Sequence, residues 1–141
     1  MSVLSLTLQW VAEATAGDMV AGEPAEVIGA VTTDTRAIEP GAVFVALKGA
    51  RYDGHDFAVD ALRAGASAVV VERSWLTTHA AELAAVPSAG AVAVDDTLRA
   101  LQDMARAIRR VSSAKVIAIT GSAGKTTTKE AIATMLTTRY R

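Results

Sequence analysis

One short stretch near the C-terminal end of the sequence, Gly121-Ser-Ala-Gly-Lys-Thr-Thr127, indicates phosphate chemistry. Gly121 and Gly124 allow the backbone to curl with positive φ, so that several N–H groups point at one spot. Lys125 adds a mobile positive charge for the β- and γ-phosphates of a nucleotide, and the Thr126 hydroxyl can reach a Mg²⁺ ion. These residue types and their spacing predict a phosphate-binding loop.

The loop departs from the general pattern G-x-x-x-x-G-K-[ST]. Five residues before Gly124 stands Ile119 rather than glycine, so the loop has the shorter form G-x-x-G-K-T-T. A strand–turn–helix with a chance Gly-Lys-Thr is the alternative interpretation. We expect a true phosphate site, because the loop lies between a predicted buried strand and a predicted helix, which is the context that the motif requires.

Apolar patterns predict the two elements that position the loop. Residues 115–120 carry the run Val-Ile-Ala-Ile, which is typical of a strand buried on both faces of a parallel sheet. Residues 128–136 place three apolar side chains on one side of a helix, whose N-terminus adds a positive dipole end to the loop. We assign nucleotide binding to Gly121, Ser122, Ala123, Gly124, Lys125, Thr126 and Thr127, catalysis to Lys125 and Thr126, and metal binding to Thr126.

Two polar segments that follow predicted strands form a second candidate site. Residues 27–33 are rich in β-branched side chains and predict a strand that runs into Thr33, Asp34, Thr35 and Arg36. Small polar groups at a strand end can meet a uracil, a ribose or a phosphate. The alternative is a turn closed by an ion pair between Asp34 and Arg36.

The second of these segments is a loop after the strand predicted over residues 42–47. It combines a positive charge, two glycines and an imidazole beside one pocket, and its candidate ligand residues are Lys48, Gly49, Asp53, Gly54 and His55. Taken alone, His55 more readily starts the next helix than binds a ligand, and Asp53 can cap that helix.

Alternating strands and helices predict an α/β fold. Further strands are expected over residues 67–71 and 91–94, and helices over 5–17, 55–64, 74–85 and 95–111. We place a boundary near Asp95. A small α/β domain of four strands over residues 1–95 then precedes residues 96–141, the first helix, strand, P-loop and helix of a parallel-sheet ATPase domain. The strand predicted over residues 115–120 needs further neighbouring strands, which residues 96–141 do not supply.

Composition narrows the class of function. The 141 residues are 51% hydrophobic and 21% charged, which is typical of a soluble globular protein. The net charge of −1 argues against a nucleic-acid partner, and the lack of cysteine excludes disulfides and a thiol nucleophile. Residues 1–16 hold no Lys or Arg, and no apolar run approaches the ~20 residues of a membrane helix. We therefore expect no signal peptide, no membrane insertion and a cytoplasmic location.

The stretch Ile119-Thr-Gly-Ser-Ala-Gly-Lys-Thr-Thr-Thr-Lys-Glu130 resembles the P-loop of the Mur ligases, the ATP-dependent amide-bond ligases of peptidoglycan synthesis. Two earlier regions resemble the family's N-terminal nucleotide-sugar domain. They are Thr33-Asp-Thr-Arg36 with Pro40-Gly-Ala-Val-Phe-Val-Ala-Leu-Lys-Gly49, and Asp53-Gly-His-Asp-Phe57 followed by Ala61 and Gly65-Ala66. These motifs stand in the family's order and cover essentially the whole chain.

The resemblance implies a carboxylate–amine ligase that uses ATP and Mg²⁺. In this family, the carboxylate that ends a UDP-MurNAc-peptide is phosphorylated, and an incoming amine attacks the acyl phosphate. Residues 1–95 would bind the UDP moiety and residues 96–141 would begin the ATPase domain. The family's remaining Mg²⁺ ligands, its carbamylated lysine and its third domain would lie beyond Arg141, so we expect the 141-residue chain alone to be inactive.

Ser122 bears on the choice of substrate. The form Gly-Ser-x-Gly-Lys-Thr followed by Thr-Lys-Glu is most similar to the branch of the family that adds D-alanyl-D-alanine to a tripeptide. The branch that adds the third residue usually reads Gly-Thr-Asn-Gly-Lys-Thr and stays as an alternative. A non-catalytic UDP-sugar-binding module is a second alternative, and a small P-loop kinase or GTPase is disfavoured because its further motifs cannot fit after the loop. We expect a monomer.

Overall fold

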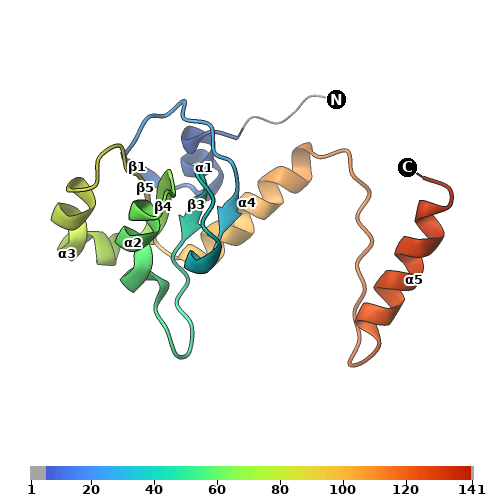
Figure 1. Cartoon of the computed structure of the whole chain (residues 1–141). Helices are drawn as coiled ribbons and strands as arrows, with labels where there is room; N and C mark the ends of the chain where they lie inside the picture. The colour runs from blue at the N-terminus through green and yellow to red at the C-terminus, as the bar shows by residue number, and fades with distance from the viewer. Residues whose placement is uncertain (1–5, 141) are drawn as a thin grey trace. The chain divides into compact units, whose positions relative to one another are not determined.

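The computed structural model describes residues 6–140, which form two compact units that divide after Val111 (Figure 1). The elements of the first unit are α1 (Leu8–Thr15), β1 (Asp18–Ala21), β2 (Val31–Thr32), the 3₁₀ helix η1 (Thr35–Ala37), β3 (Val43–Val45), the 3₁₀ helix η2 (Gly54–Phe57), α2 (Ala58–Arg63), β4 (Ala68–Glu72), α3 (Arg73–Ala84), β5 (Gly90–Val94) and α4 (Thr97–Val111). The second unit contains α5 (Lys125–Thr137). None of the helices described is both long and apolar enough to span a membrane.

Within the described residues, five strands form one sheet in the order β1-β5-β4-β3-β2. Strands β2 to β5 are parallel, with Phe44 opposite Val69 and Val70 opposite Val92. The predicted α/β class is thus confirmed. Strand β1 was not predicted, because its residues alternate between exposed and half-buried and lack a β-branched run. It pairs antiparallel with β5 at the edge of the sheet.

Each central strand of the sheet is buried on both faces. Val43, Val45 and Val70 pack in one cluster with α1 and α4, whereas Phe44, Val69 and Val71 pack in another with α2 and α3. Figure 1 shows these two helix pairs on opposite sides of the sheet. Since successive side chains of a strand point to opposite faces, a strand covered on both sides must be apolar at every position. That requirement explains the continuous apolar runs that predicted these strands.

The strand predicted over residues 27–33 is shorter than expected and comprises only β2. The segment before β2 pairs instead with the chain that enters α1. There the Ile28 N–H donates to the Leu6 carbonyl at 2.8 Å, and Val27 forms an isolated bridge with Thr7. The backbone of residues 27 and 28 is therefore satisfied outside the main sheet.

The N-terminus of α1 is capped by Thr7. Its hydroxyl accepts a hydrogen bond from the Trp10 N–H at 3.2 Å.

Helix α4 belongs to the first compact unit, so the two units divide after this helix and not near Asp95. Ala100 and Met104 of α4 are each 2% exposed and join the core cluster of α1 and the sheet. The structural division moves to Val111, because α4 covers one face of the sheet. Two apolar residues of α4, Leu98 and Val111, are exposed. The assignment of residues 1–95 to UDP-sugar binding and 96–141 to ATP binding stays a prediction.

The strand predicted over residues 115–120 is not formed in the described structure. Val116 and Ile117 are 61% and 59% exposed, and none of the strand pairings found among residues 6–140 involves this segment. A strand requires neighbouring strands for its N–H and C=O groups, and a single apolar run cannot supply them. Helix α5 does form, and it begins at Lys125, immediately after Gly124.

Thr97 ties the start of α4 to the end of β3. Its side chain is 2% exposed, and its hydroxyl donates to the Ala46 carbonyl at 2.7 Å. Valine keeps the shape of threonine but removes this donor, so we expect Thr97→Val to lower the free energy of unfolding by about 1–2 kcal/mol. Urea denaturation followed by tryptophan fluorescence measures the loss, because both tryptophans, Trp10 and Trp75, lie in the first unit.

Thr97→Ser is the matched variant, since serine keeps the hydroxyl and loses only a methyl group. We expect the serine variant to retain the hydrogen bond to Ala46. A valine variant as stable as the unmodified chain would show that this buried hydrogen bond contributes nothing to the fold.

Candidate functional site

The carboxyl ends of the parallel strands meet at one edge of the sheet, and in open α/β sheets ligands bind at that edge. Residues 33–36 follow β2 and residues 48–55 follow β3, and β2 and β3 are neighbours in the sheet. The structure therefore brings the two predicted groups of UDP-site residues to the same edge. Whether they bind the ligand stays a prediction.

Asp34 and Arg36 form the ion pair that the alternative interpretation of this segment describes. Asp34 caps η1, and its Oδ1 accepts from the Arg36 backbone N–H at 2.9 Å. The guanidinium adds two bonds in parallel, from Nε to Oδ1 at 2.9 Å and from Nη2 to Oδ2 at 2.7 Å. Hydrogen bonds from the side chain and then the backbone of Arg36 lower the pKa of Asp34 to about 2.

This ion pair predicts a dependence of stability on pH. The pKa of Asp34 in the folded chain, about 2, lies below the ordinary value of 3.8. Ionised Asp34 therefore stabilises the fold fully above about pH 4, and that contribution is lost as the pH falls toward 2. A pH titration of the Asp34 carboxyl carbon, followed by NMR, should give a pKa of about 2.

Arg36→Ala should return the pKa of Asp34 toward its ordinary value, because it removes the side-chain hydrogen bonds. Arg63→Ala is the matched control, since Arg63 pairs with another carboxylate, Asp60, at 3.4 Å. Equal shifts of the Asp34 pKa in both variants would mean that general charge, rather than the local pair, lowers it.

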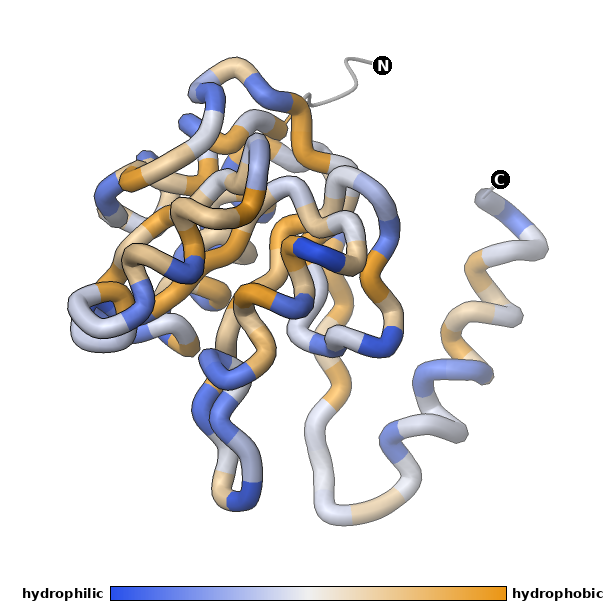
Figure 2. The backbone as a smooth tube through the Cα atoms, turned by 60° about the vertical axis from the view of Figure 1, so that its left-hand side comes forward, coloured by the Kyte–Doolittle hydropathy of each residue, from blue (hydrophilic) through white to orange (hydrophobic). Residues whose placement is uncertain are grey.

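Residues 48–53 form a loop that folds back on itself. Lys48 and Asp53 pair in an isolated bridge, the Gly49 N–H donates to the Tyr52 carbonyl at 2.9 Å, and the Gly54 N–H donates to the Leu47 carbonyl at 2.8 Å. Figure 2 shows the loop as a largely hydrophilic projection beyond the hydrophobic strands. It presents polar groups next to the end of β3 while its base stays fixed to the sheet.

His55 is held inside the first unit by both of its ring nitrogens. Its side chain is 3% exposed, and Asp53 Oδ1 lies 2.6 Å from Nδ1 and 3.0 Å from the His55 backbone nitrogen. Nε2 accepts from the Glu72 N–H at 3.0 Å, which assigns the ring proton to Nδ1. No ring nitrogen is left for a ligand. The geometry thus favours the interpretation of His55 as a helix-start residue and of Asp53 as the cap of η2.

Arg73 is a further charged residue at this edge, and it was not among the predicted site residues. Its Nε donates to Asp95 Oδ1 at 2.8 Å, and its guanidinium also pairs with Asp18 of β1. These two carboxylates raise the pKa of Arg73. The hydrogen bond to Asp95 has the largest effect, and the hydrogen bond to Asp18 has the next largest. Its partners lie far along the sequence, so no local pattern could have revealed this cluster.

The predicted phosphate-binding loop has the backbone that such a loop requires. Gly121 and Gly124 have φ of 152° and 76°, both in the region that favours glycine. A Cβ at Gly124 would meet no atom within 4 Å, so its conformation, rather than space, requires glycine there. The Lys125 ammonium folds back onto the Gly121 carbonyl. The loop thus combines two left-handed glycines with a lysine poised beside them.

The start of α5 fits an anionic ligand. No side chain caps this helix, and the first bond back to the loop runs from the Thr128 N–H to the Gly124 carbonyl at 3.0 Å. The N–H groups of the three preceding residues, 125–127, have no partner within an α-helix. These donors and the helix dipole favour a phosphate at this point. Among residues 6–140, no three His, Cys, Asp or Glu side chains form a group that could hold a metal ion.

Comparisons with known proteins point to one family. The family described as "Mur ligase family, catalytic domain" matches residues 27–109. The chain is 46% identical over 115 residues to the UDP-N-acetylmuramoyl-tripeptide–D-alanyl-D-alanine ligase of Bacillus subtilis, a match that covers 82% of this chain and 24% of the relative.

Solved structures give the same result. A crystal structure of MurF from Acinetobacter baumannii has a TM-score of 0.76 and 33% identity, over 94% of this chain and 28% of that one. MurF ligase from Thermotoga maritima in complex with ADP has a TM-score of 0.60 and 37% identity, over 77% of this chain and 23% of that one. The chain thus spans about a quarter of the length of these relatives.

Proposed function

Because the chain belongs to the Mur ligase family, we propose that it supplies the UDP-binding unit and the phosphate-binding loop of an ATP-dependent ligase. The proposed ligase adds D-alanyl-D-alanine to a UDP-MurNAc-tripeptide, the activity named for the Bacillus subtilis relative. The observation that carries the proposal is the loop before α5, where two left-handed glycines and an uncapped helix start surround Lys125. Ser122, in the form Gly-Ser-x-Gly-Lys-Thr, supports the D-alanyl-D-alanine branch of the family.

The first unit would bind the UDP moiety through its carboxyl edge. Residues 33–36 and the loop of residues 48–54 are the polar segments at the ends of β2 and β3. Thr33 and Thr35 would offer hydroxyls to the uracil or ribose, and Gly49 and Gly54 would allow the ligand to approach the backbone. The hydrogen bonds of His55 argue that it supports this loop rather than contacting the nucleotide.

The phosphate-binding loop would hold the nucleotide that drives the reaction. Bound ATP with Mg²⁺ supplies the phosphoryl group that activates the peptide carboxylate as an acyl phosphate. The N–H groups of residues 121–127 would hold the β- and γ-phosphates. Lys125 would leave the Gly121 carbonyl to neutralise charge on the phosphates, and the Thr126 hydroxyl would ligate the metal. These residues act mainly by position and charge, which is what phosphoryl transfer demands.

A substrate-dependence assay on the ligase that carries this sequence tests the proposal. We expect release of ADP and phosphate only when UDP-MurNAc-tripeptide and D-alanyl-D-alanine are both present. Turnover with a UDP-MurNAc-dipeptide and a single amino acid would instead identify the branch that adds the third residue. No turnover with either pair would contradict the proposed activity.

Calorimetric titration of the 141-residue chain separates the ligase from a non-catalytic UDP-sugar-binding module. Binding of both UDP and Mg²⁺-ATP supports the ligase, because the loop then works as a nucleotide site. Tight binding of UDP with no detectable binding of ATP supports the module. The proposal also includes a monomeric chain, a cytoplasmic reaction and no nucleic-acid partner.

A further inference from the structure

Three of the cations that follow the parallel strands, Arg36, Arg73 and Lys48, differ in their contacts with carboxylates. Arg36 makes two side-chain hydrogen bonds to Asp34 at 2.9 Å and 2.7 Å. Arg73 is fixed between two carboxylates, one of them at 2.8 Å. Lys48 Nζ, in contrast, lies 3.7 Å from Asp53 Oδ2, too far for a normal hydrogen bond, and its side chain is 70% exposed. Of these three cations, Lys48 is therefore the one that donates no hydrogen bond of normal length to a carboxylate.

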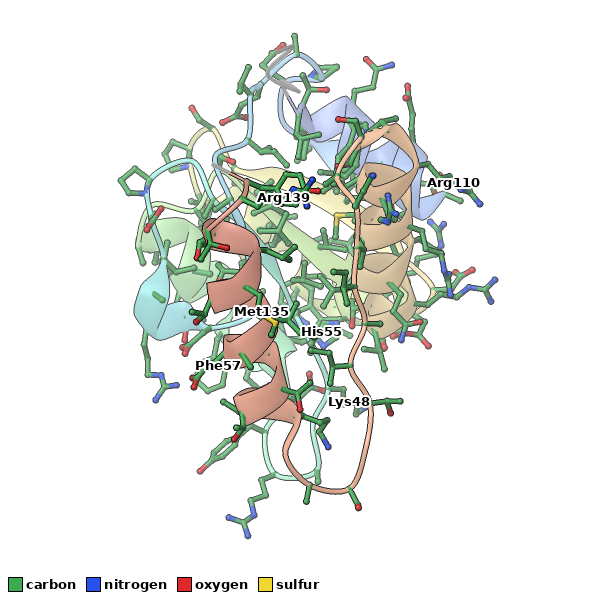
Figure 3. All side chains as sticks on the ribbon, turned by 90° about the vertical axis from the view of Figure 1, so that its right-hand side faces the viewer. Lys48, His55, Phe57, Arg110, Met135 and Arg139 are labelled. Carbon is green, nitrogen blue, oxygen red and sulfur yellow. The ribbon has the colours of Figure 1, made fainter. Side chains whose placement is uncertain are left out.

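A chain of contacts holds Lys48 in place from the interior of the first unit. The Glu72 N–H donates to His55 Nε2, and His55 Nδ1 donates to Asp53 Oδ1. The other oxygen of Asp53 faces Lys48. Burial raises the pKa of Asp53, but the hydrogen bonds from His55 and the charge of Lys48 outweigh it, so that the pKa is lowered and the carboxyl is ionised. Lys48 and His55 are both labelled in Figure 3.

Resting on the proposed function, we infer that Lys48 binds the diphosphate of the UDP moiety and that the buried His55 positions Lys48 through Asp53 without touching the ligand. The exposed ammonium is a point charge with three donors, the group that suits a phosphate. Asp53 Oδ2, at 3.7 Å, attracts the Lys48 ammonium without accepting a hydrogen bond of normal length from it. The N–H donors of Lys48 therefore stay available to a ligand. His55 is thereby a positioning residue, and the two residues that the sequence grouped as ligands have different roles.

Calorimetric titration of the 141-residue chain with UDP tests the role of Lys48. We expect Lys48→Met to raise the Kd for UDP about tenfold, a loss typical of one charge-assisted contact, and to leave the Kd for uridine unchanged. Arg51→Met is the matched control, since it removes a cation from the same exposed loop. If Arg51→Met weakens UDP binding and Lys48→Met does not, the assignment of Lys48 is overturned.

Two substitutions of His55 separate positioning from folding. Asparagine retains a donor toward Asp53, and glutamine retains an acceptor toward the Glu72 N–H. We expect both to lower the melting temperature, but only His55→Gln to weaken UDP binding strongly. In the Lys48→Met background, His55→Gln should change the Kd for UDP no further, because its effect passes through Lys48.

The outcomes distinguish this inference from the proposed function. A wild-type chain that does not bind UDP overturns both. A different result is that the wild-type chain binds UDP, but His55→Asn and His55→Gln both weaken the binding of UDP and of uridine in proportion to their loss of stability. The proposed UDP site then still holds. In that case His55 has only a structural role and the positioning assignment is wrong.

Discussion

Replacing Lys125 with alanine is expected to abolish ATP-dependent turnover of the ligase while UDP binding persists. The Lys125 ammonium stands beside the loop, in contact with the Gly121 carbonyl, and is the charge nearest to where the phosphates would lie. Loss of such a charge typically lowers kcat by about 10³-fold, or roughly 4 kcal/mol of transition-state stabilisation. Release of phosphate in the presence of both substrates measures the loss.

UDP binding should survive this substitution, because the candidate UDP residues belong to the first compact unit and Lys125 belongs to the second. Lys129→Ala is the matched control, since it removes a lysine from the same helix one turn further along. We expect it to retain most of the turnover. Loss of UDP binding together with turnover in the Lys125 variant would contradict the division of labour between the two units.

Replacing Gly54 with alanine should be among the most destabilising small changes in the first unit. A Cβ at this position would lie 2.8 Å from both the backbone nitrogen and the backbone oxygen of Leu47. Those atoms belong to the segment that leaves β3 and cannot move without breaking the hydrogen bond from the Gly54 N–H to the Leu47 carbonyl. We expect a loss of about 2–3 kcal/mol, the usual size of an overpacking defect.

Gly29→Ala is the matched control for this substitution. Its Cβ would meet its nearest neighbour, the Pro40 carbonyl oxygen, at 3.7 Å, an ordinary contact. Urea denaturation followed by tryptophan fluorescence compares the two variants. The Gly54 variant should also bind UDP more weakly, because the displaced segment carries Lys48. Equal stability of the two variants would show that the backbone of Leu47 can move away from the added methyl group at little cost in free energy.

The apolar runs of the central strands were enough to predict β3, β4 and β5, because a strand buried on both faces must be apolar at every position. Helix α5 and its glycine turn were likewise predictable, since the signals are local: glycines, a lysine and a helical repeat. Strand β1 escaped prediction because what makes it a strand is its pairing with β5, from Asp18 opposite Ala93 onward.

The candidate UDP residues could be selected from the sequence, whereas their individual structural environments could not. The sequence places Asp53, Gly54 and His55 side by side. Only the fold shows that His55 is buried against the Glu72 N–H, and that Gly54 is required by its close approach to Leu47 rather than by a positive φ. Both facts depend on contacts between residues distant along the chain.

The phosphate-binding loop was predictable from the sequence alone, because its chemistry lies in consecutive residues whose backbone conformation is set locally. The glycines at 121 and 124 adopt the conformations that their spacing suggested. Tertiary structure decided what local patterns cannot express. The apolar run at residues 116–119 does not pair as a strand in the described structure, since a strand exists only through its neighbours. Helix α4 belongs to the first unit because its buried face packs on the sheet. Lys48 lies 3.7 Å from Asp53, whereas Arg36 and Arg73 make hydrogen bonds of normal length to their carboxylate partners.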